Sequence, residues 1–278
     1  PEAGCRGAAS IVGVGQVVGL RARVFGHRTL PLDEYGALRT YVGGEIGEFW
    51  VYQTAGIFQN QAEVDEWNTA HGYKDQNGNW QPLQPVDKPG DNHFIDQNGD
   101  GIVNEKDRVV IGNPNPDFTY GINSSLSYKN FSLDLSLTGV QGNDIINANL
   151  IDETDVKNAQ KNVRKDAYLK AWTPENGGNL YPRLGYEPTG LLTDRYVESG
   201  SYLKLNYVTL SYIVPLKKSS FIKNLTLSAT ANNLFTITSY SGYDPDVNSF
   251  ASDVDRVGID LVSYPSSRSF TFGINAKF

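Results

Sequence analysis

The chain has 278 residues, 12% of them aromatic, and a formal net charge of −7. An acidic chain lacks the basic surface that nucleic-acid phosphates require, so nucleic acid is not an expected partner. A lone cysteine allows neither an internal disulfide nor a cysteine metal cluster. No run approaches the roughly 20 apolar residues of a membrane helix. The absence of methionine indicates a carboxyl-terminal fragment of a longer protein.

Residues 1–42 are rich in Gly, Ala, Arg and Val and keep no sustained period, so this segment is left unassigned. A divergent pair of strands and sequence foreign to the remainder are both open readings. Residues 43–278 are predicted to form one unit. Within it, a short strand over 48–52 leads into a polar loop over 55–116.

The clearest strands follow at 117–128 and 131–138, where apolar and polar residues alternate. Only Lys129 and Asn130 separate them, so the two segments are predicted to form a β-hairpin. A second long polar loop is expected over 141–200, with a helix within 158–172.

Three more strands complete the chain. Residues 202–214 alternate with a one-residue phase slip, which predicts a β-bulge. A short basic link leads to the strand at 225–232, and a third polar loop, 238–268, precedes the terminal strand ending at Phe278. The connections between strands are therefore alternately short and long.

Strands of about ten residues, one apolar face and one polar face, and alternating loop lengths are typical of outer-membrane β-barrels. The predicted fold class is all-β: the carboxyl-terminal portion of a large transmembrane antiparallel β-barrel with long extracellular loops. The apolar faces would meet lipid and the polar faces would line the lumen.

One motif carries metal chemistry. Residues 96–107 place oxygen-bearing groups at positions 1, 3, 5, 7, 9 and 12 of a twelve-residue loop, and Gly101 at position 6 provides the turn. The predicted Ca²⁺ ligands are Asp96, Asn98, Asp100, Ile102 (through its carbonyl), Asn104 and Asp107. A structural role is expected, and a pair of ordinary turns is the alternative.

No catalytic residues are predicted, and the protein is not expected to be an enzyme. His27, His71 and His93 lie in unrelated contexts and fit solvated loops better than a catalytic or metal site. Loop aromatics are expected to pack or anchor the loops, with sugar stacking as the alternative. They are Trp67, Trp80, Trp172, Tyr240 and Tyr243.

Several motifs in fixed order resemble the carboxyl-terminal part of SusC/RagA-type, TonB-linked outer-membrane proteins of Bacteroidetes. The motifs are Gly44-Glu-Ile-Gly-Glu-Phe-Trp-Val-Tyr52, Pro89-Gly-Asp91, Phe94-Ile-Asp-Gln-Asn-Gly-Asp-Gly101, Asn232-Asn-Leu-Phe235 and Tyr240-Ser-Gly-Tyr-Asp-Pro245. The resemblance covers residues 43–278.

The resemblance implies a plugged barrel in the outer membrane of a Gram-negative cell, in contact with its lipid. Such proteins import oligosaccharides or peptides with a SusD-like surface lipoprotein, driven by TonB, ExbB and ExbD through an amino-terminal region absent here. It also implies that Phe278 is a barrel-assembly signal.

Two alternatives from other classes remain at this point. The first is a secreted, Ca²⁺-stabilised β-sandwich that binds glycans, in which the apolar strand faces would bury against each other. The second is a β-rich hydrolase, which would need a convergent acid and base or nucleophile that the sequence does not display.

Overall fold

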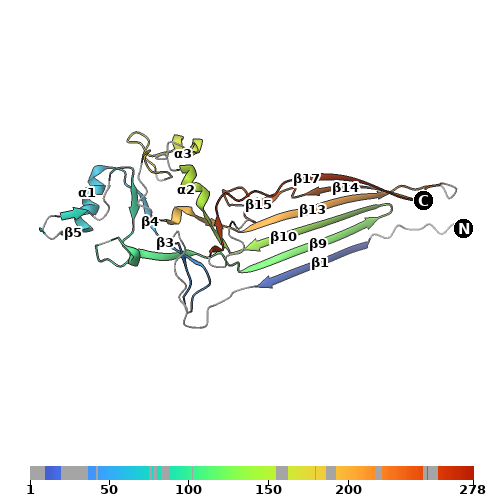
Figure 1. Ribbon diagram of the computed structural model, residues 1–278, viewed down its shortest axis with the longest axis horizontal. Coiled ribbons are helices and arrows are strands. Elements are labelled where there is room, and N and C mark those ends of the chain that lie inside the picture. The colour runs from blue at the N-terminus through green and yellow to red at the C-terminus, as the bar shows by residue number, and fades with distance from the viewer. Residues whose placement is uncertain are drawn as a thin grey trace.

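The computed structural model describes residues 10–19, 37–41, 43–74, 77, 80–82, 88–101, 103–154, 162–178, 180–185, 192–216, 221–246, 249 and 256–278. Long strands form one end of the elongated molecule, and short strands and helices form a lobe at the other (Figure 1). The carboxyl terminus lies at the end away from the lobe.

Six antiparallel strands make up the long sheet. In spatial order they are β1 (Ser10–Gly19), β9 (Phe118–Tyr128), β10 (Phe131–Gln141), β13 (Tyr202–Ile213), β14 (Asn224–Asn232) and β17 (Ser269–Lys277). A short strand, β15 (Thr236–Thr238), pairs with the beginning of β13 beyond the end of β14. β1 falls inside the segment 1–42, for which the sequence predicts no fold.

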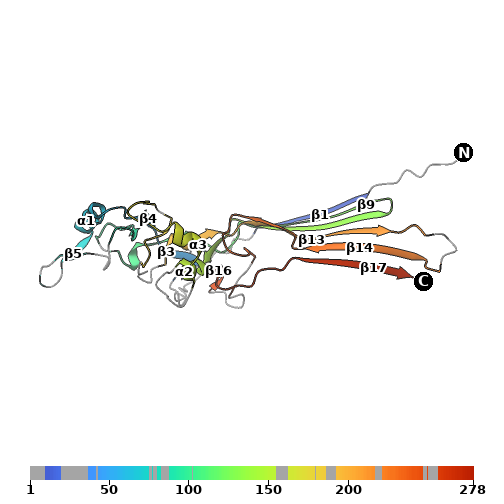
Figure 2. The ribbon, with the colours of Figure 1, turned by 90° about the horizontal axis from the view of Figure 1, so that it is seen from above.

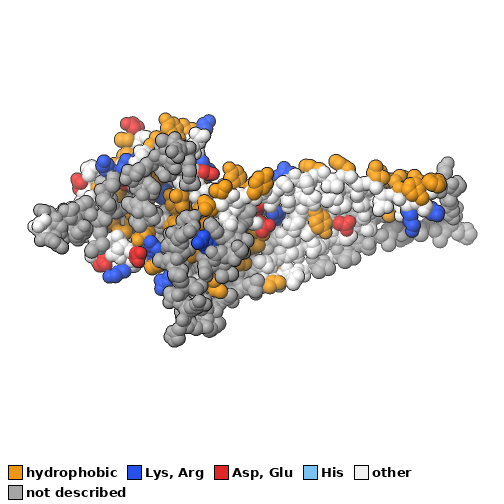
Figure 3. All heavy atoms as spheres, in the orientation of Figure 1, with side chains coloured by type: hydrophobic (Ala, Val, Ile, Leu, Met, Phe, Trp, Pro, Cys, Tyr) orange, Lys and Arg blue, Asp and Glu red, His pale blue; other side chains and the backbone are white. Residues whose placement is uncertain are grey.

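The strand register sorts the side chains into two faces. Leu133 lies between Leu126 and Leu210, whereas the adjacent Ser132 lies between Ser127 and Ser211. Figure 3 shows the polar face, and Figure 2 shows the sheet as one curved layer. The predicted alternation is therefore confirmed, and the predicted strands of the sheet each carry an apolar and a polar side.

The apolar face is exposed. On β17, Phe270, Phe272 and Ile274 are 62%, 82% and 77% exposed. Among the described residues no second sheet packs on this face. The β-sandwich alternative is wrong, because it needs a facing sheet to bury these side chains.

The predicted hairpin and bulge are both present. Lys129, with φ of 55°, and Asn130 make the two-residue turn between β9 and β10. Along β10, Ser136 faces Tyr207 and the next residue, Leu137, faces Leu205. Asn206 is therefore the extra residue of a bulge in β13, one position from the phase slip seen in the sequence.

The connections sort by length, as predicted. The connections from β9 to β10 and from β13 to β14 are short, and these strands meet them at the end with the carboxyl terminus. The long segments after β1, β10 and β14 all lead into the lobe (Figure 1). This arrangement places three long loops on one side of the sheet.

The lobe contains four small sheets. They are β2 (Leu38–Arg39) with β3 (Glu48–Tyr52) and β8 (Arg108–Gly112); β4 (Thr54–Ile57) with β7 (Asn92–Phe94); β5 (Gly72–Lys74) with β6 (Trp80–Pro82); and β12 (Val197–Ser199) with β11 (Asp144–Asn147) and β16 (Ile259–Asp260).

The helices of the lobe are short. They are α1 (Gln61–Ala70), α2 (Ala148–Thr154), α3 (Lys165–Leu169) and the 3-10 turns η1 (Glu105–Asp107) and η2 (Asp194–Tyr196). Of the helix predicted within 158–172, the structure describes only α3, and the N-cap residue before it, Arg164, makes no side-chain cap bond. No helix in the described part of the chain has the length and apolarity to span a membrane.

A hydrophobic core holds the three long loops together. Its buried side chains come from segments far apart in the sequence: Ala37, Leu38, Phe49, Val51, Ile146, Ala148 and Ile259. Phe49 and Val51 are fully buried at 0% exposure. The loops after β1, β10 and β14 therefore form one packed unit, since each supplies part of a shared core.

Candidate functional site

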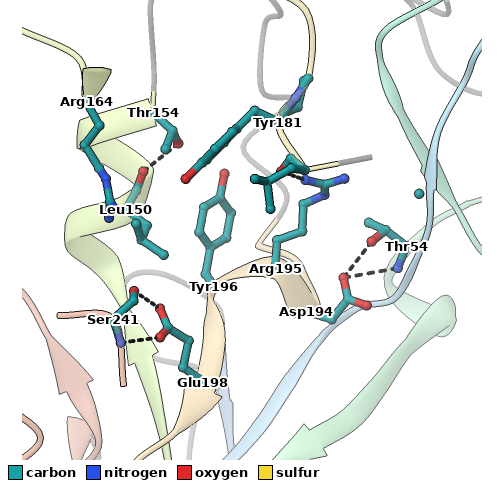
Figure 4. A pocket seen from close by; sticks show the side chains of 13 residues that line it. Thr54, Leu150, Thr154, Arg164, Tyr181, Asp194, Arg195, Tyr196, Glu198 and Ser241 are labelled. Atoms are coloured by element: carbon teal, nitrogen blue, oxygen red, sulfur yellow. Dashed lines mark hydrogen bonds between the residues drawn. The ribbon is translucent and has the colours of Figure 1, made fainter. Parts of the chain in front are cut away.

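A cavity of about 530 Å³ lies between the loops of the lobe. Helix α2, turn η2, strands β4 and β12 and the segment 180–182 form its walls. Figure 4 shows Tyr181 and Tyr196 extending into the same space from opposite sides, with Arg195 beside them. Two aromatic rings and a guanidinium group therefore face the cavity.

The polar side chains of the cavity wall are tied to neighbouring loops. Asp194 accepts hydrogen bonds from the amide and hydroxyl of Thr54, at 3.2 and 2.8 Å. Arg195 Nη1 donates to the Leu180 carbonyl at 2.6 Å, and the Tyr181 hydroxyl donates to Asp166 at 2.9 Å. The bonds to Thr54 join the loops after β1 and β10, and the other two bonds hold the loop after β10 together around the cavity.

Arg164, which forms ion pairs with two carboxylates, closes one side of the cavity. Arg164 bonds Asp166 through Nε at 3.0 Å and lies 3.6 Å from Glu153. The bond to Arg164 is the main cause holding the pKa of Asp166 below its ordinary value. Burial, and then the bond to Asp166, raises the pKa of Tyr181, so this phenol stays protonated. The site can hold a ligand by stacking and hydrogen bonding.

A buried lysine anchors the loop after β14 to the sheet. Lys204 is 4% exposed, and its Nζ donates to Asp246 at 3.1 Å, to Asp244 at 3.5 Å and to the Ser266 hydroxyl at 3.0 Å. Burial acts to raise the pKa of Asp244, but hydrogen bonds from Ser266 and the Asp246 amide, with the charge of Lys204, outweigh it and lower the pKa. Sequence reasoning missed this cluster, since Lys204 lies 40 or more residues from each of its partners.

The Pro89-Gly-Asp91 motif forms a second clasp between loops. Asp91, 1% exposed, accepts from Arg183 Nε at 2.6 Å. Gly90, with φ of 91°, donates to the Phe58 carbonyl and leaves no room for a Cβ under the Trp172 ring. Burial is the largest influence on Asp91 and raises its pKa despite the arginine. The motif thus joins the loop after β1 to the loop after β10.

The predicted calcium loop folds around its own carboxylates. Asp96 accepts from the amides of Gly99 and Gly101 at 2.7 and 2.8 Å. Burial acts to raise the pKa of Asp96, but these amide bonds outweigh it and hold the pKa below its ordinary value. Fully buried Asp107 accepts from the amides of Gln97 and Asn104. These bonds bring both ends of the predicted loop together.

The remaining predicted ligands are placed as follows. Asn98 accepts from the Asp100 amide, and Asn104 caps turn η1 by accepting from the Lys106 amide. Ile102 lies outside the described residues. Within the ranges described, no three His, Cys, Asp or Glu side chains are gathered as a metal site. The loop has the predicted turns, with its carboxylates directed at backbone amides.

The histidines are less exposed than the sequence indicates. His93 stacks on Phe58 at 4.5 Å and meets Trp67 edge-on, and His71 stacks on Trp67 at 3.6 Å. Burial, and then the neighbouring His71, lowers the pKa of His93. The solvated-loop reading is therefore wrong for these two, because the aromatic rings around α1 cover them. His27 lies outside the described residues.

The loop aromatics mostly pack, as expected. Trp172 and Tyr240 are 7% and 6% exposed, whereas Tyr243 is 75% exposed. Trp172 also donates to Gln59 at 3.1 Å. At the opposite end of the molecule, the ring of Phe278 lies 5.2 Å from that of Phe221 and is 62% exposed.

Comparison with known proteins gives consistent matches. The chain is 33% identical to the TonB-dependent receptor P3 of Formosa agariphila over 243 residues, covering 85% of this chain and 22% of that protein. It is 28% identical to the TonB-dependent receptor SusC of Bacteroides thetaiotaomicron, covering 69% of this chain and 18% of SusC. The chain therefore spans about a fifth of the length of these relatives. No family model matches.

The fold matches a solved structure of the RagAB peptide transporter with a TM-score of 0.72 and 20% identity, over 97% of this chain and 27% of that one. Together with the two-faced sheet and the sorted loops, this match defines the chain as a portion of a large β-barrel. The matches to P3 and SusC identify the family of barrel proteins. The chain belongs to the SusC/RagA family of TonB-dependent receptors.

Proposed function

We propose that the chain forms part of the wall and the surface loops of an outer-membrane transporter that takes up nutrients. The relatives are named as receptors and as a peptide transporter, which supports transport rather than catalysis. Oligosaccharides and peptides are the proposed substrate classes. Under this proposal, the loops 55–116, 141–200 and 238–268 lie outside the cell.

The exposed apolar face of the long sheet is the observation that carries the proposal. Phe270, Phe272 and Ile274 would be unstable in water as a contiguous patch but are favourable against lipid. The opposite face, rich in Ser, Thr and Asn, suits a water-filled or plugged lumen. The outer strands of the sheet, β1 and β17, then offer their free edges to other strands of the barrel.

The proposed partners follow from family membership. A SusD-like surface lipoprotein would cover the extracellular side, and TonB with ExbB and ExbD would supply energy from the inner membrane. The packed core of the lobe supports this arrangement, because a rigid unit can receive a lid without first paying an ordering cost. Substrate would be held near the cavity between Tyr181 and Tyr196.

Fractionation of the whole protein from its host tests the proposal. We expect recovery in the detergent-extracted outer membrane, migration that changes on heating, and a co-purifying lipoprotein. Recovery as a soluble monomer would overturn the proposal. Outer-membrane recovery without a lipoprotein would overturn the proposed partnership while leaving the barrel assignment intact.

We also propose that residues 96–107 bind a structural Ca²⁺ ion. The carboxylate oxygens of Asp96 and Asp107 that accept hydrogen bonds from backbone amides still have lone pairs with which to bind a cation. The same hydrogen bonds already hold the loop folded. Asp96→Asn should weaken Ca²⁺ binding at least tenfold by isothermal titration. Asp65→Asn, on the exposed face of α1, is the matched control and should not. Equal affinities for both variants would refute this site.

Phe278 is proposed as a signal for barrel assembly. Its exposed ring at the end of β17 is available to a folding factor. Phe278→Ala should slow the appearance of the heat-modifiable form in pulse-chase labelling, whereas Phe221→Ala, which removes the neighbouring ring, should not. Equal delays would favour simple loss of the aromatic contact.

A further inference from the structure

A group of polar side chains gathers on one face of the small sheet β12–β11–β16. Asn147 on β11 is the register partner of Asp260 on β16. Glu198 on β12 is the partner of Ile145, two residues from Asn147, so it projects to the same side. Three oxygen-bearing side chains from three neighbouring strands therefore lie together.

The loop after β14 covers this group with Tyr240 and Ser241. The Tyr240 hydroxyl donates to Asp260 Oδ2 at 2.6 Å. Glu198 accepts from the Ser241 amide and hydroxyl, each at 2.7 Å, and from Asn147 Nδ2 at 3.0 Å. The last bond fixes the orientation of the Asn147 amide, because the flipped amide would set oxygen against a carboxylate.

Two oxygens of the group have no donor. Asp260 Oδ1 and Asn147 Oδ1 are enclosed and make no hydrogen bond to any described residue. Both residues are 1% exposed. Burying an acceptor without a donor is unfavourable, and more so when the acceptor is charged. Two such acceptors on paired residues call for a shared positive partner.

The two ionisable side chains of this group, Glu198 and Asp260, are both acidic. In the described part of the chain, neither Glu198 nor Asp260 lies within ion-pair distance of a Lys, Arg or His. The nearby Glu153 is offset by Arg164 at 3.6 Å. Two carboxylates are thus left without a compensating cation.

We propose that a partly hydrated divalent cation, of the Mg²⁺ or Ca²⁺ class, binds Asp260 Oδ1 and Asn147 Oδ1. Mg²⁺ is commonly held by one or two carboxylates with several retained waters, so a site with few protein ligands suffices. A pocket of about 300 Å³ borders Asn147, and the Glu153–Arg164 ion pair forms part of its wall. At about 30 Å³ per water, it has room for the hydration shell.

Bound there, the cation would pin β16 to β11, and the Tyr240 hydroxyl is bonded to the same Asp260. This site is separate from the loop at 96–107, and it does not depend on the transport proposal. It concerns how the loop after β14 is fixed to the loop after β10. Its ligands lie on different loops, so ion removal should loosen the contact between them.

The test uses the whole protein in detergent with Asp96→Asn as the background, which removes the other proposed ion. After chelation and dialysis against Mg²⁺ or Ca²⁺ separately, bound metal is counted by elemental mass spectrometry. Asp260→Asn should lose one ion per protein relative to the background, in one or both metals. Glu175→Gln is the matched control, an exposed carboxylate in the loop that carries Asn147, and should lose none.

Amide hydrogen exchange gives the second readout. Chelation should speed exchange of residues 239–246 at least threefold in the background protein, and metal should restore it. Heat-modifiable migration checks that each variant folds. The proposal is overturned if the folded background protein and Asp260→Asn hold equal metal, or if chelation leaves exchange unchanged. Either result would mean that a proton on Asp260 or a bound water satisfies the two oxygens.

Discussion

The two faces of β13 give the sharpest test of the barrel assignment. Val208 lies on the apolar face opposite Leu135, and the next residue, Thr209, lies on the polar face opposite Asp134. Leu135 is the fifth of the eleven residues of β10, so both positions are near the middle of the wall. Val208→Arg should destabilise the inserted protein by about 2–4 kcal/mol, the cost of an arginine facing lipid near the midplane.

Thr209→Arg places the same side chain in the lumen. It removes the 2.8 Å hydrogen bond between Thr209 and Thr230, worth about 0.5–1.5 kcal/mol. It also sets a cation opposite Asp134, which returns about 0.2–1 kcal/mol. The two effects nearly cancel. The difference between the variants is therefore about 2–4 kcal/mol, or roughly 30- to 900-fold in the folding equilibrium.

The assay is urea or guanidinium unfolding of the whole protein in lipid vesicles, followed by tryptophan emission and by heat-modifiable migration. Val208→Arg should shift the midpoint to lower denaturant, and Thr209→Arg should stay near the parent. Equal midpoints, or a larger loss for Thr209→Arg, would refute the assignment of lipid and lumen faces.

Three further outcomes are expected. Gly139→Ala should lower the denaturation midpoint, by about 1–3 kcal/mol, because a Cβ there would overlap the Tyr120 ring; adding Tyr120→Ala should recover part of the loss. Arg183→Ala should cost about 3–5 kcal/mol by leaving Asp91 buried without its partner, and Asp91→Asn in the same chain should recover part of it. The pKa of Asp244 is lowered in the folded state, so the stability that its carboxylate adds is present above the ordinary aspartate pKa and is lost as the pH falls through the lower pKa of the folded state. Hydrogen exchange of residues 239–246 should therefore rise only under strongly acidic conditions.

The long strands could be predicted because their signal is local. Alternation over ten residues fixes which side chains share a face, and the two residues between 128 and 131 allow only a hairpin. β1 gave no such signal, since Gly13 and Gly15 interrupt its apolar positions. Its place in the sheet is set by its partner β9, which lies about 100 residues further along the chain.

The lobe and its sites could not be predicted from local pattern. Phe49 and Ile146 share a core although nearly 100 residues separate them. The cavity likewise joins Tyr181 to Thr54 through chain segments that read separately as polar loops. Only the calcium-type loop could be predicted from the sequence, because all its candidate ligands lie within twelve consecutive residues.

The bulge in β13 decides on which side of the wall a charge resides. If β13 kept strict alternation through Asn206, with no bulge, the even-numbered phase of Val208 and Leu210 would extend to Lys204 and direct its ammonium group at the apolar face. The bulge instead pairs Lys204 with Thr138 on the polar face, where the lysine reaches Asp244 and Asp246. One added residue thus acts as a frame change. It keeps a charge away from the apolar face and makes that charge the fastening of the loop after β14.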